Sequence, residues 1–348
     1  MIQLSSRTRG SILVLVSWVL VFLTIVSLSI GFLVRQRLNA AGKIEDREKL
    51  RLIAEAGVKK VISIHSKSGK SQPYDALNDS WSRSEMEFKE VRVGDGTFMV
   101  SHLQSDDGDL SSDAQLSLWY GAVDENRKIN INLVSDPNIL RALIRDVTGL
   151  DDQEAVKIAE SIFDWRDEDD SRHLSGAESR YYESLSPPYR PKNAPFSSLE
   201  ELLLVQGMTE KILNQLRPYL TLFGTGTINL NTASKKVLKA IGVNDSIVKK
   251  ILSYRRGLDG KMGTRDDQAF SELSSIASEL EQKSALNDDE KTALEASIGK
   301  GLLAVKSTHF MIESVGTLDH KKKTHLKVLC VAEQNGNIVF WNEKFLSD

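Results

Sequence analysis

The N-terminal segment of this chain places the strongest constraint on its fold. Residues 11–34 contain no charged side chain, and Arg7 and Arg9 precede them. A helix needs roughly 20 apolar residues to cross the hydrocarbon core of a bilayer, so this segment is long enough to span a membrane. The first proline of the chain is Pro73. Nothing covalent therefore prevents one helix from running from residue 11 to about residue 65, as a rod of roughly 80 Å.

The apolar segment has three interpretations. A cleaved secretory signal has an apolar region of about 7–15 residues, which is shorter than this one. A plain signal anchor would leave the bulk of the chain outside the cytoplasm. A type IV pilin-like leader would end at Gly10, and a dedicated peptidase would cut before Ser11 and retain the whole helix. Two arginines flank the segment on each side, so the charge bias leaves the orientation open.

Beyond the apolar segment the helical pattern becomes amphipathic. Apolar or small residues recur at helical spacing and form one stripe: Leu50, Ile53, Ala54, Gly57, Val58, Val61 and Ile64. A stripe of this kind must be buried against another element. The combination of a lipid-compatible half and a half that packs on a sheet is typical of pilins, and it favours the pilin-like leader, with residues 1–10 as the leader and residues 11–34 as the transmembrane half of the helix.

Strand patterns occur on both sides of a helical region. Alternating apolar residues and turn signals predict strands over residues 86–103 (a hairpin), 116–123, 305–315, 325–332 and 338–345. The sequence therefore predicts an α+β fold, in which a long N-terminal helix packs on an antiparallel sheet. This pilin-like domain would comprise residues 35–128 and 302–348, with an all-helical insertion over residues 129–301.

The predicted insertion contains two related units. The sequence KININ at residues 128–132 recurs as TINLN at residues 227–231. In each unit a helix leads to a glycine and an aliphatic residue, at Gly149 and Gly242, and a second helix then ends on an aromatic residue and an arginine. Each unit continues through an Asp-rich loop and restarts at Phe-Ser. Such an internal repeat predicts two copies of one supersecondary unit.

These units resemble the helix-hairpin-helix element, which in many proteins binds a DNA phosphate at the N-terminus of its second helix. Here the second helices begin with Asp151, Thr209 and Asn244, each followed by a carboxylate. These residues cap the helix and oppose a phosphate. Residues 136–220 hold 16 acidic and 10 basic residues, a net charge of −6, which is the wrong sign for a nucleic-acid interface. We therefore expect packed hairpins that bind no nucleic acid.

The two Asp-rich loops are the best candidates for a cofactor site. The candidate ligands are Asp167, Asp169, Asp170 and Glu178 in the first loop and Asp259, Asp266 and Asp267 in the second. Calcium takes six to eight oxygen ligands on flexible loops, and closely spaced carboxylates supply them, although neither loop has EF-hand spacing. The alternative is a solvated acidic loop whose carboxylates pair with Arg166, Arg255 and Arg265. We expect calcium in at least one loop.

Signatures of catalysis are absent from the sequence. It contains no G-x-S-x-G and no H-E-x-x-H motif. The single cysteine, Cys330, has no intramolecular partner for a disulfide. We therefore expect a structural protein and not an enzyme.

Several sequence blocks, in the same order along the chain, carry a family resemblance. They are the basic leader that ends at Gly10, AEAGV at residues 54–58, Asp124-Glu125 ahead of ININ at 129–132, DWRDED at 164–169, GAE at 176–178, Tyr181-Tyr182, VQGM at 205–208, PYLT at 218–221 and INLNTA at 228–233. This pattern resembles the minor pseudopilin K family of the type II secretion system. The resemblance spans most of the chain.

The resemblance implies a non-enzymatic subunit at the tip of the periplasmic pseudopilus, where it initiates and caps assembly for protein export across the outer membrane. It implies two other minor pseudopilins and the major pseudopilin as partners, cleavage and methylation by the prepilin peptidase, and bound calcium. The chain would cross the inner membrane once, with its bulk in the periplasm, and could meet the secretin or a secreted substrate.

Two positions near the cleavage site bear on this assignment. Most pilins carry glutamate at the fifth mature residue, which here is Leu15, as in the K subunit. Ser11 departs from the usual first residue, Phe or Met. The alternative function from another class is a membrane-anchored DNA-uptake protein that uses the helix-hairpin-helix units.

Overall fold

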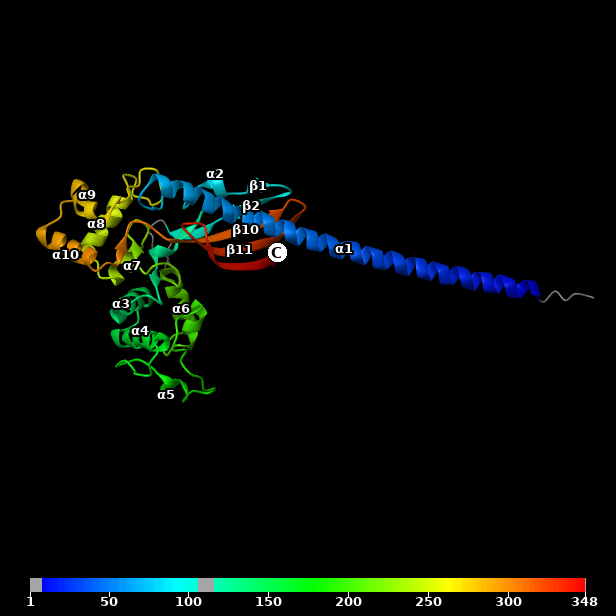
Figure 1. Ribbon diagram of the computed structural model, residues 1–348, viewed down its shortest axis with the longest axis horizontal. Helices are drawn as coiled ribbons and strands as arrows, with labels where there is room; N and C mark the ends of the chain where they lie inside the picture. The colour runs from blue at the N-terminus through cyan, green and yellow to red at the C-terminus, as the bar shows by residue number, and fades with distance from the viewer. Residues whose placement is uncertain (1–7, 106–115, 348) are drawn as a thin grey trace, which may run out of the picture. The chain divides into compact units, whose positions relative to one another are not determined.

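The computed structural model describes residues 8–105 and 116–347 and divides into two compact units (Figure 1). The first unit ends at Leu52 and the second begins at Ile53. Helix α1 (Thr8–Ser71) provides all the described residues of the first unit. Residues 1–7 of the predicted leader lie outside the described residues.

The apolar part of α1 has the properties of a membrane span. Its large apolar side chains are exposed between Ile12 and Leu38, and the helix is long and apolar enough to cross a bilayer. The prediction of one long N-terminal helix is confirmed, although the helix begins at Thr8 instead of Ser11 and ends at Ser71 instead of His65.

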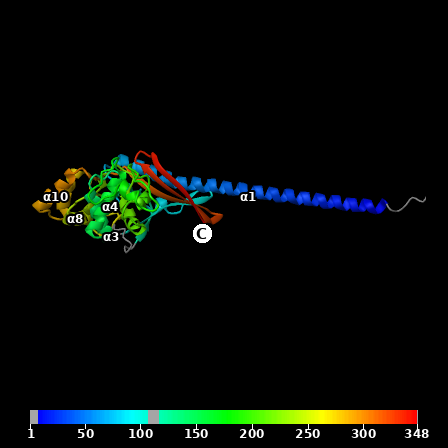
Figure 2. The ribbon, with the colours of Figure 1, turned by 90° about the horizontal axis from the view of Figure 1, so that it is seen from below.

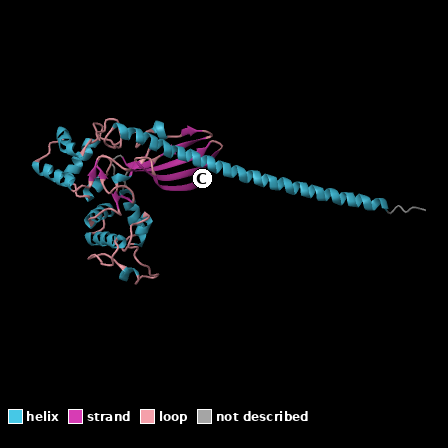
Figure 3. Cartoon of the chain, viewed as in Figure 1, coloured by secondary structure: helices cyan, strands magenta, loops and turns pink. Residues whose placement is uncertain are grey.

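The second unit contains an antiparallel sheet, shown in magenta in Figure 3. Its strands are β1 (Val91–Val93), β2 (Gly96–Val100), β5 (Val123–Asp124), β10 (His309–Leu318), β11 (Lys321–Glu333) and β12 (Ile338–Ser347). Their order is β1-β2-β10-β11-β12, and β5 also pairs with β10. The predicted combination of helices with an antiparallel sheet is confirmed.

The part of α1 that belongs to the second unit packs on this sheet. Ala54 and Val58 are fully buried, and the Ser314 hydroxyl of β10 donates a hydrogen bond to the Ala54 carbonyl at 2.7 Å. A side chain at Gly57 would collide with Ser314 and with Phe98 of β2. Glycine and alanine at these positions therefore let the helix backbone approach the sheet closely.

Two predicted strands differ from the observed elements. The hairpin expected over residues 86–103 begins later, because residues 85–88 form the short helix α2 (Glu85–Phe88). A turn with Glu90 at φ 48° then leads into β1. The strand expected over residues 116–123 is two strands, because β4 (Leu116–Trp119) pairs with β3 (His102–Ser105) and β5 pairs with β10. Gly121 separates them where the chain passes against the backbone of Ser82.

The region between β5 and β10 is mainly helical. Its helices are α3 (Pro137–Thr148), α4 (Asp152–Arg166), α5 (Ser179–Tyr182), α6 (Glu210–Leu216), α7 (Lys235–Ala240), α8 (Asp245–Arg255), α9 (Ile276–Lys283) and α10 (Asp288–Gly299), with 3-10 turns at η1 (Glu125–Arg127), η2 (Leu199–Leu204), η3 (Arg217–Tyr219) and η4 (Leu273–Ser275). Helices α8 and α10 lie together at one end of the second unit in both views (Figures 1 and 2). That the helices on either side of Gly149 and of Gly242 form helix-hairpin-helix units stays a prediction.

Two short parallel ladders hold the ends of this region. Strand β6 (Ile129–Asn130) pairs with β7 (Leu220–Thr221), and β8 (Ile228–Asn229) pairs with β9 (Leu303–Ala304). The segment from β6 to β7 and the segment from β8 to β9 are thus each closed by one such ladder. We call them the first and second helical units.

An asparagine clamp occurs in both helical units. The Asn132 side chain accepts a hydrogen bond from the Phe196 amide at 2.8 Å and donates to the Phe196 carbonyl at 3.0 Å. Asn231 makes the same two bonds with Phe270, at 2.8 and 3.0 Å. The Phe-Ser restart of each unit is therefore the point at which the chain returns to the asparagine that follows the first strand of the ladder.

The two helical units also share the hydrogen bonds of an arginine, which ends α4 in the first unit and α8 in the second. Arg166 donates to the carbonyls of Ile131 and Val134. Arg255 donates to the carbonyls of Leu230 and Ala233, at 3.2 and 2.7 Å. These equivalent bonds align α4 with α8 residue by residue, with Arg166 matching Arg255.

A buried polar cluster joins the sheet to the second helical unit. The carboxylate of Asp124, on β5, accepts hydrogen bonds from Thr232 at 2.5 Å, Ser307 at 2.6 Å and Asn229 at 3.2 Å. Asp75 accepts from the Ser307 amide at 2.9 Å, and its carbonyl accepts from Asn229 at 3.0 Å. All five residues are buried, and we call them the Asp124 cluster.

The Asp124 cluster also reaches helix α1. The His65 imidazole lies 3.0 Å from the Asp75 carboxylate, and both side chains are almost fully buried. The ring of His65 packs against Phe310 of β10 and the edge of Trp81. The cluster thus connects α1, the sheet and the second helical unit.

Replacing Asp124 with alanine should lower the free energy of unfolding by about 3 kcal/mol or more. The groups that donate to this carboxylate would remain buried without an acceptor, and each such group costs about 1–3 kcal/mol. Urea denaturation of the full chain in detergent measures the change. The matched control is Asp136→Ala, which removes only the exposed cap of α3 and should cost about 1 kcal/mol. Equal losses in the two variants would contradict the structural role of the cluster.

Candidate metal sites

The first Asp-rich loop folds back over the helix that precedes it. Helix α4 ends at Arg166, and the loop returns so that the Ser175 amide donates to the Glu160 carboxylate at 2.5 Å. The His173 amide donates to Asp164 at 3.1 Å, and its imidazole also binds that carboxylate. Gly176 lies so close to Asp164 that a side chain there would collide with it. Loop residues 171–178 therefore cover the C-terminal half of α4.

Three carboxylates beneath this loop have unsatisfied oxygens. Asp164 is completely buried and Glu178 is 4% exposed. One oxygen of Asp164, one of Asp167 and both oxygens of Glu178 are buried and accept no hydrogen bond within the described part of the chain. Buried charges are normally paired or bound to a metal, because leaving them uncompensated is costly. We call Asp164, Asp167 and Glu178 the carboxylate cluster.

The electrostatics of the carboxylate cluster favour a cation. Burial, together with the charges of Asp164, Asp167 and Asp170, raises the pKa of Glu178 to about 8. Burial, followed by the charge of Asp169, also raises the pKa of Asp167. These carboxylates repel one another when ionised, and a divalent cation among them would remove that repulsion.

The predicted ligands of the first loop take different positions. Asp167 and Glu178 belong to the carboxylate cluster. Asp169 and Asp170 are exposed and accept hydrogen bonds from the amides of Ser171 at 2.7 Å and Ser179 at 3.2 Å. Those bonds stabilise turns of the loop and leave the two carboxylates at its outer surface.

Two residues of this site were missed by the sequence prediction. Asp164 supplies the most buried carboxylate, and donor atoms of Asp164, Asp167 and His173 lie within 4.8 Å of one another. A signal for Asp164 was present, because it stands between Phe163 and Trp165 in a run of buried positions, where an unpaired carboxylate is rare. His173 had no comparable signal.

The second Asp-rich loop satisfies its own carboxylates. Donor atoms of Asp259, Asp266 and Asp267 also lie within 4.8 Å of one another. However, Asp266 accepts from the amides of Leu258 at 2.6 Å and Asp259 at 3.0 Å, and Asp267 accepts from the Gly263 amide at 2.6 Å. Hydrogen bonds from the backbone and from a threonine lower the pKa of Asp266 to about 2. Asp266 therefore needs no cation to stay ionised, whereas burial raises the pKa of Asp267 despite its hydrogen bonds.

The chemistry of the carboxylate cluster suits calcium. The atoms of the cluster that lack a hydrogen-bond partner are all carboxylate oxygens, and oxygen is the ligand that calcium prefers. His173 already binds Asp164 through its ring, so the imidazole would hold the ligand Asp164 in place and would not be a ligand itself. A cation held here would tie the loop to α4, and the site fits a structural ion.

Comparisons of the sequence identify related proteins. A family described as "Type II secretion system (T2SS), protein K" matches residues 127–225, which include α3 to α6 and the first Asp-rich loop. The type II secretion system protein K of Aeromonas hydrophila is 32% identical over 126 residues, covering 33% of this chain and 37% of that protein. The alignment with this first relative thus spans little more than a third of its length.

Longer alignments occur with two further relatives of the same description. The protein from Pectobacterium carotovorum is 25% identical over 256 residues, covering 69% of this chain and 72% of that protein. The protein from Pseudomonas aeruginosa is 24% identical over 270 residues, covering 74% and 75% respectively.

A solved structure shares the fold. A chain in the crystal structure of the GspK-GspI-GspJ complex from the enterotoxigenic Escherichia coli type II secretion system superimposes with a TM-score of 0.62 at 18% identity. The match covers 86% of this chain and 97% of that chain. Sequence and fold therefore agree, and this chain is similar to the type II secretion system protein K family in both.

Proposed function

We propose that this protein is a minor pseudopilin at the tip of the type II secretion pseudopilus, where it initiates and caps assembly without any catalytic role. The observation that carries this proposal is helix α1. Its N-terminal part is apolar and exposed, whereas its part within the second unit packs on an antiparallel sheet through Ala54 and Gly57. A helix of this kind suits both insertion in a bilayer and packing in a filament.

The absence of charge at Leu15 supports a position at the tip. An ionised glutamate in lipid needs a partner, and in a pilin filament that partner is the amino terminus of the subunit above. Leu15 needs no such partner. A subunit with leucine there can therefore occupy the end of a filament at no electrostatic cost.

The partners in this proposal are two other minor pseudopilins and the major pseudopilin. The solved complex that shares this fold is titled as GspK with GspI and GspJ, which supports a tip complex of three subunits. The prepilin peptidase would remove residues 1–10 and methylate Ser11. The protein would then cross the inner membrane once, with its bulk in the periplasm, and the helical insertion could meet the secretin or a secreted substrate.

Calcium in the first Asp-rich loop is the second part of the proposal. Asp164, Asp167 and Glu178 would hold the ion. Asp169 and Asp170 would complete its coordination, directly or through water. The ion would supply the positive charge that the carboxylate cluster lacks. Asp259, Asp266 and Asp267 form a weaker candidate site, because their oxygens already accept amide hydrogen bonds.

The alternative function, DNA uptake through helix-hairpin-helix units, is not favoured. Asp151 caps α4, Thr209 caps α6 and Asn244 caps α8, each by accepting a backbone N–H. Those N–H groups are the ones that would otherwise bind a phosphate.

Calcium should raise the unfolding temperature of the full chain in detergent by about 5–10 °C over its value in EGTA. An ion present at 100 times its dissociation constant adds about 2.7 kcal/mol, and each kcal/mol shifts the midpoint of a domain of this size by about 2–4 °C. Glu178→Gln should abolish the calcium-dependent shift. Glu168→Gln, an exposed carboxylate in the same loop, is the matched control and should retain it. An identical midpoint in calcium and EGTA would refute the structural ion.

Intact-mass spectrometry of the protein from cells that hold a prepilin peptidase should show a chain that begins at Ser11 and carries one added methyl group. Gly10→Leu should retain residues 1–10, because the peptidase cuts after a glycine. Gly31→Leu changes a glycine inside the apolar segment and should be processed normally. A retained leader in the unmodified protein would exclude pseudopilin processing.

Gold-labelled antibody against an epitope tag at the C-terminus should mark one end of pseudopili in electron micrographs. The same tag on the major pseudopilin should mark the whole length of the filament. Label from the tagged chain spread along the filament would contradict a position at the tip, even if the leader is cleaved as expected.

A further inference from the structure

The chain that continues from the carboxylate cluster contains little regular structure. Residues 167–195 connect α4 to the clamp at Phe196, and the one helix in this fully described connection is the single turn α5. Connections longer than about 12–15 residues without secondary structure are uncommon in compact domains and usually have a function. We call residues 179–195, the part beyond loop residues 171–178, the strap.

Aromatic side chains and two hydrogen bonds hold the strap on α4. The ring of Tyr182, which is fully buried, has its centroid 5.2 Å from that of Trp165 on α4 and 5.4 Å from that of Tyr189. The Tyr189 hydroxyl donates to the Leu204 carbonyl at 2.9 Å, and the Asn193 amide donates to the Trp165 carbonyl at 3.0 Å. The strap therefore covers Trp165, which is buried.

Glu178 joins the carboxylate cluster to the strap. It is the residue before α5, and its carbonyl accepts the amides of Tyr181 at 2.8 Å and Tyr182 at 3.3 Å. Its side chain does not cap the helix, and both of its carboxylate oxygens are buried and accept no hydrogen bond within the described part of the chain. A buried carboxylate without a partner opposes the fold that buries it. The backbone of Glu178 thus supports the strap, whereas its side chain opposes it.

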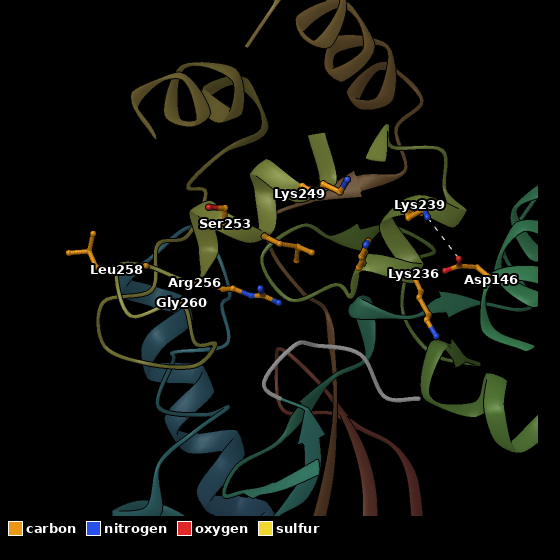
Figure 4. A pocket seen from close by; sticks show the side chains of 11 residues that line it. Asp146, Lys236, Lys239, Lys249, Ser253, Arg256, Leu258 and Gly260 are labelled. Atoms are coloured by element: carbon orange, nitrogen blue, oxygen red, sulfur yellow. Dashed lines mark ion pairs between the residues drawn. The ribbon is translucent and has the colours of Figure 1, made fainter. Parts of the chain in front are cut away.

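The second helical unit has the shared framework but differs in both of these features. The positions that match Asp164 and Asp167 hold Ser253 and Arg256 (Figure 4). The connection that follows α8 spans residues 256–269, which is too short to contain a counterpart of the strap. The clamp and the arginine bonds therefore form without a strap, and the strap occurs in the unit that has the carboxylate cluster.

We propose that the strap folds on α4 only when a cation is bound at the carboxylate cluster, whereas the sheet and the second helical unit fold without the ion. When the charge of Glu178 is compensated by a cation, the aromatic contacts of the strap form at no electrostatic cost. When it is not, detachment of the strap lets water reach the carboxylate. This inference rests on the calcium part of the proposed function, and it adds a conformational change that the ion controls.

The strap can detach without unfolding the rest of the first helical unit. The chain on either side of it is held by bonds that do not involve the strap. Arg166, before it, donates to the carbonyls of Ile131 and Val134. Phe196, after it, is clamped by Asn132. Proteins open locally in cooperative segments that few contacts tie to the core, so the expected open state has the strap detached and the clamp intact.

Hydrogen–deuterium exchange of the full chain in detergent, read by mass spectrometry of its peptides, tests this inference. In EGTA the amides of the strap should exchange nearly as fast as those of an unfolded peptide, while amides of α8 and β11 stay protected. Calcium at 100 times its dissociation constant shifts a local opening equilibrium about 100-fold if the ion binds only the closed state. The amides of Tyr182 and Asn193 should therefore exchange about 100 times more slowly in calcium than in EGTA.

Two substitutions of glutamate by glutamine separate the ion from the folding of the strap. Glu178→Gln keeps the shape of the side chain and removes its charge, so exchange in the strap should no longer depend on calcium. Glu183→Gln is the matched control, because Glu183 is an exposed carboxylate of the strap that pairs with Arg190 at 2.7 Å, and this variant should retain the full effect of calcium. Protection of α8 reports whether either variant is folded.

Isothermal titration calorimetry with calcium on the same protein tells the possible failures apart. If calcium binds and the strap is equally protected in calcium and in EGTA, the inference about the strap is wrong and the structural ion stands. If no calcium binds, the calcium part of the proposed function is wrong, and the strap inference is wrong with it. If the strap, α8 and β11 lose protection together in EGTA, the ion supports the whole fold, which also overturns a locally controlled strap.

Discussion

The buried carboxylate of Asp124 is the interaction on which the arrangement of the second unit depends. Asp124 belongs to the sheet, Asn229 and Thr232 belong to the second helical unit, and Ser307 stands where the chain returns to β10. Burial raises the pKa of Asp124 to about 6, so the donated hydrogen bonds are needed to compensate the cost of the buried charge. The helical region leaves the sheet and rejoins it around this one group, which therefore joins the two parts.

The two helical units share a framework of hydrogen bonds but differ in the residues on one face of their second helix. The Asn132 clamp on Phe196 and the Asn231 clamp on Phe270 have the same hydrogen bonds, and Arg166 and Arg255 hold equivalent carbonyls. These groups fix the backbone, and they are the residues that made the repeat visible in the sequence. Another face of the second helix differs between the units. On α4 it carries Glu160 and Asp164 and is covered by loop residues 171–178, whereas the matching positions of α8 are the exposed Lys249 and Ser253.

The sequence predicted those parts of the fold that depend on local pattern. Helix α1 followed from the lack of charge and proline, and the strands of the sheet followed from alternation and turn residues. Phe88 was predicted to lie in the first strand of the hairpin, because the sequence pattern grouped it with the alternating Val91 and Val93. In the structure it ends α2, and a turn at Glu90 separates that helix from β1. The candidate metal site of the first loop was predicted only in part, because the burial of Asp164 depends on a loop that returns over its own helix.

These differences suggest why a pilin-like chain would retain so large a helical region. In the proposed function a helix and an antiparallel sheet already suffice for packing in a filament. In our proposals the carboxylate cluster makes the covering of α4 conditional on a cation, because without one Asp164, Asp167 and Glu178 repel each other beneath the loop. The matching positions of α8 are Lys249, Ser253 and Arg256, so this ion site has no counterpart on that helix. One repeated framework would thus carry an ion-binding face in its first copy and a different face in its second.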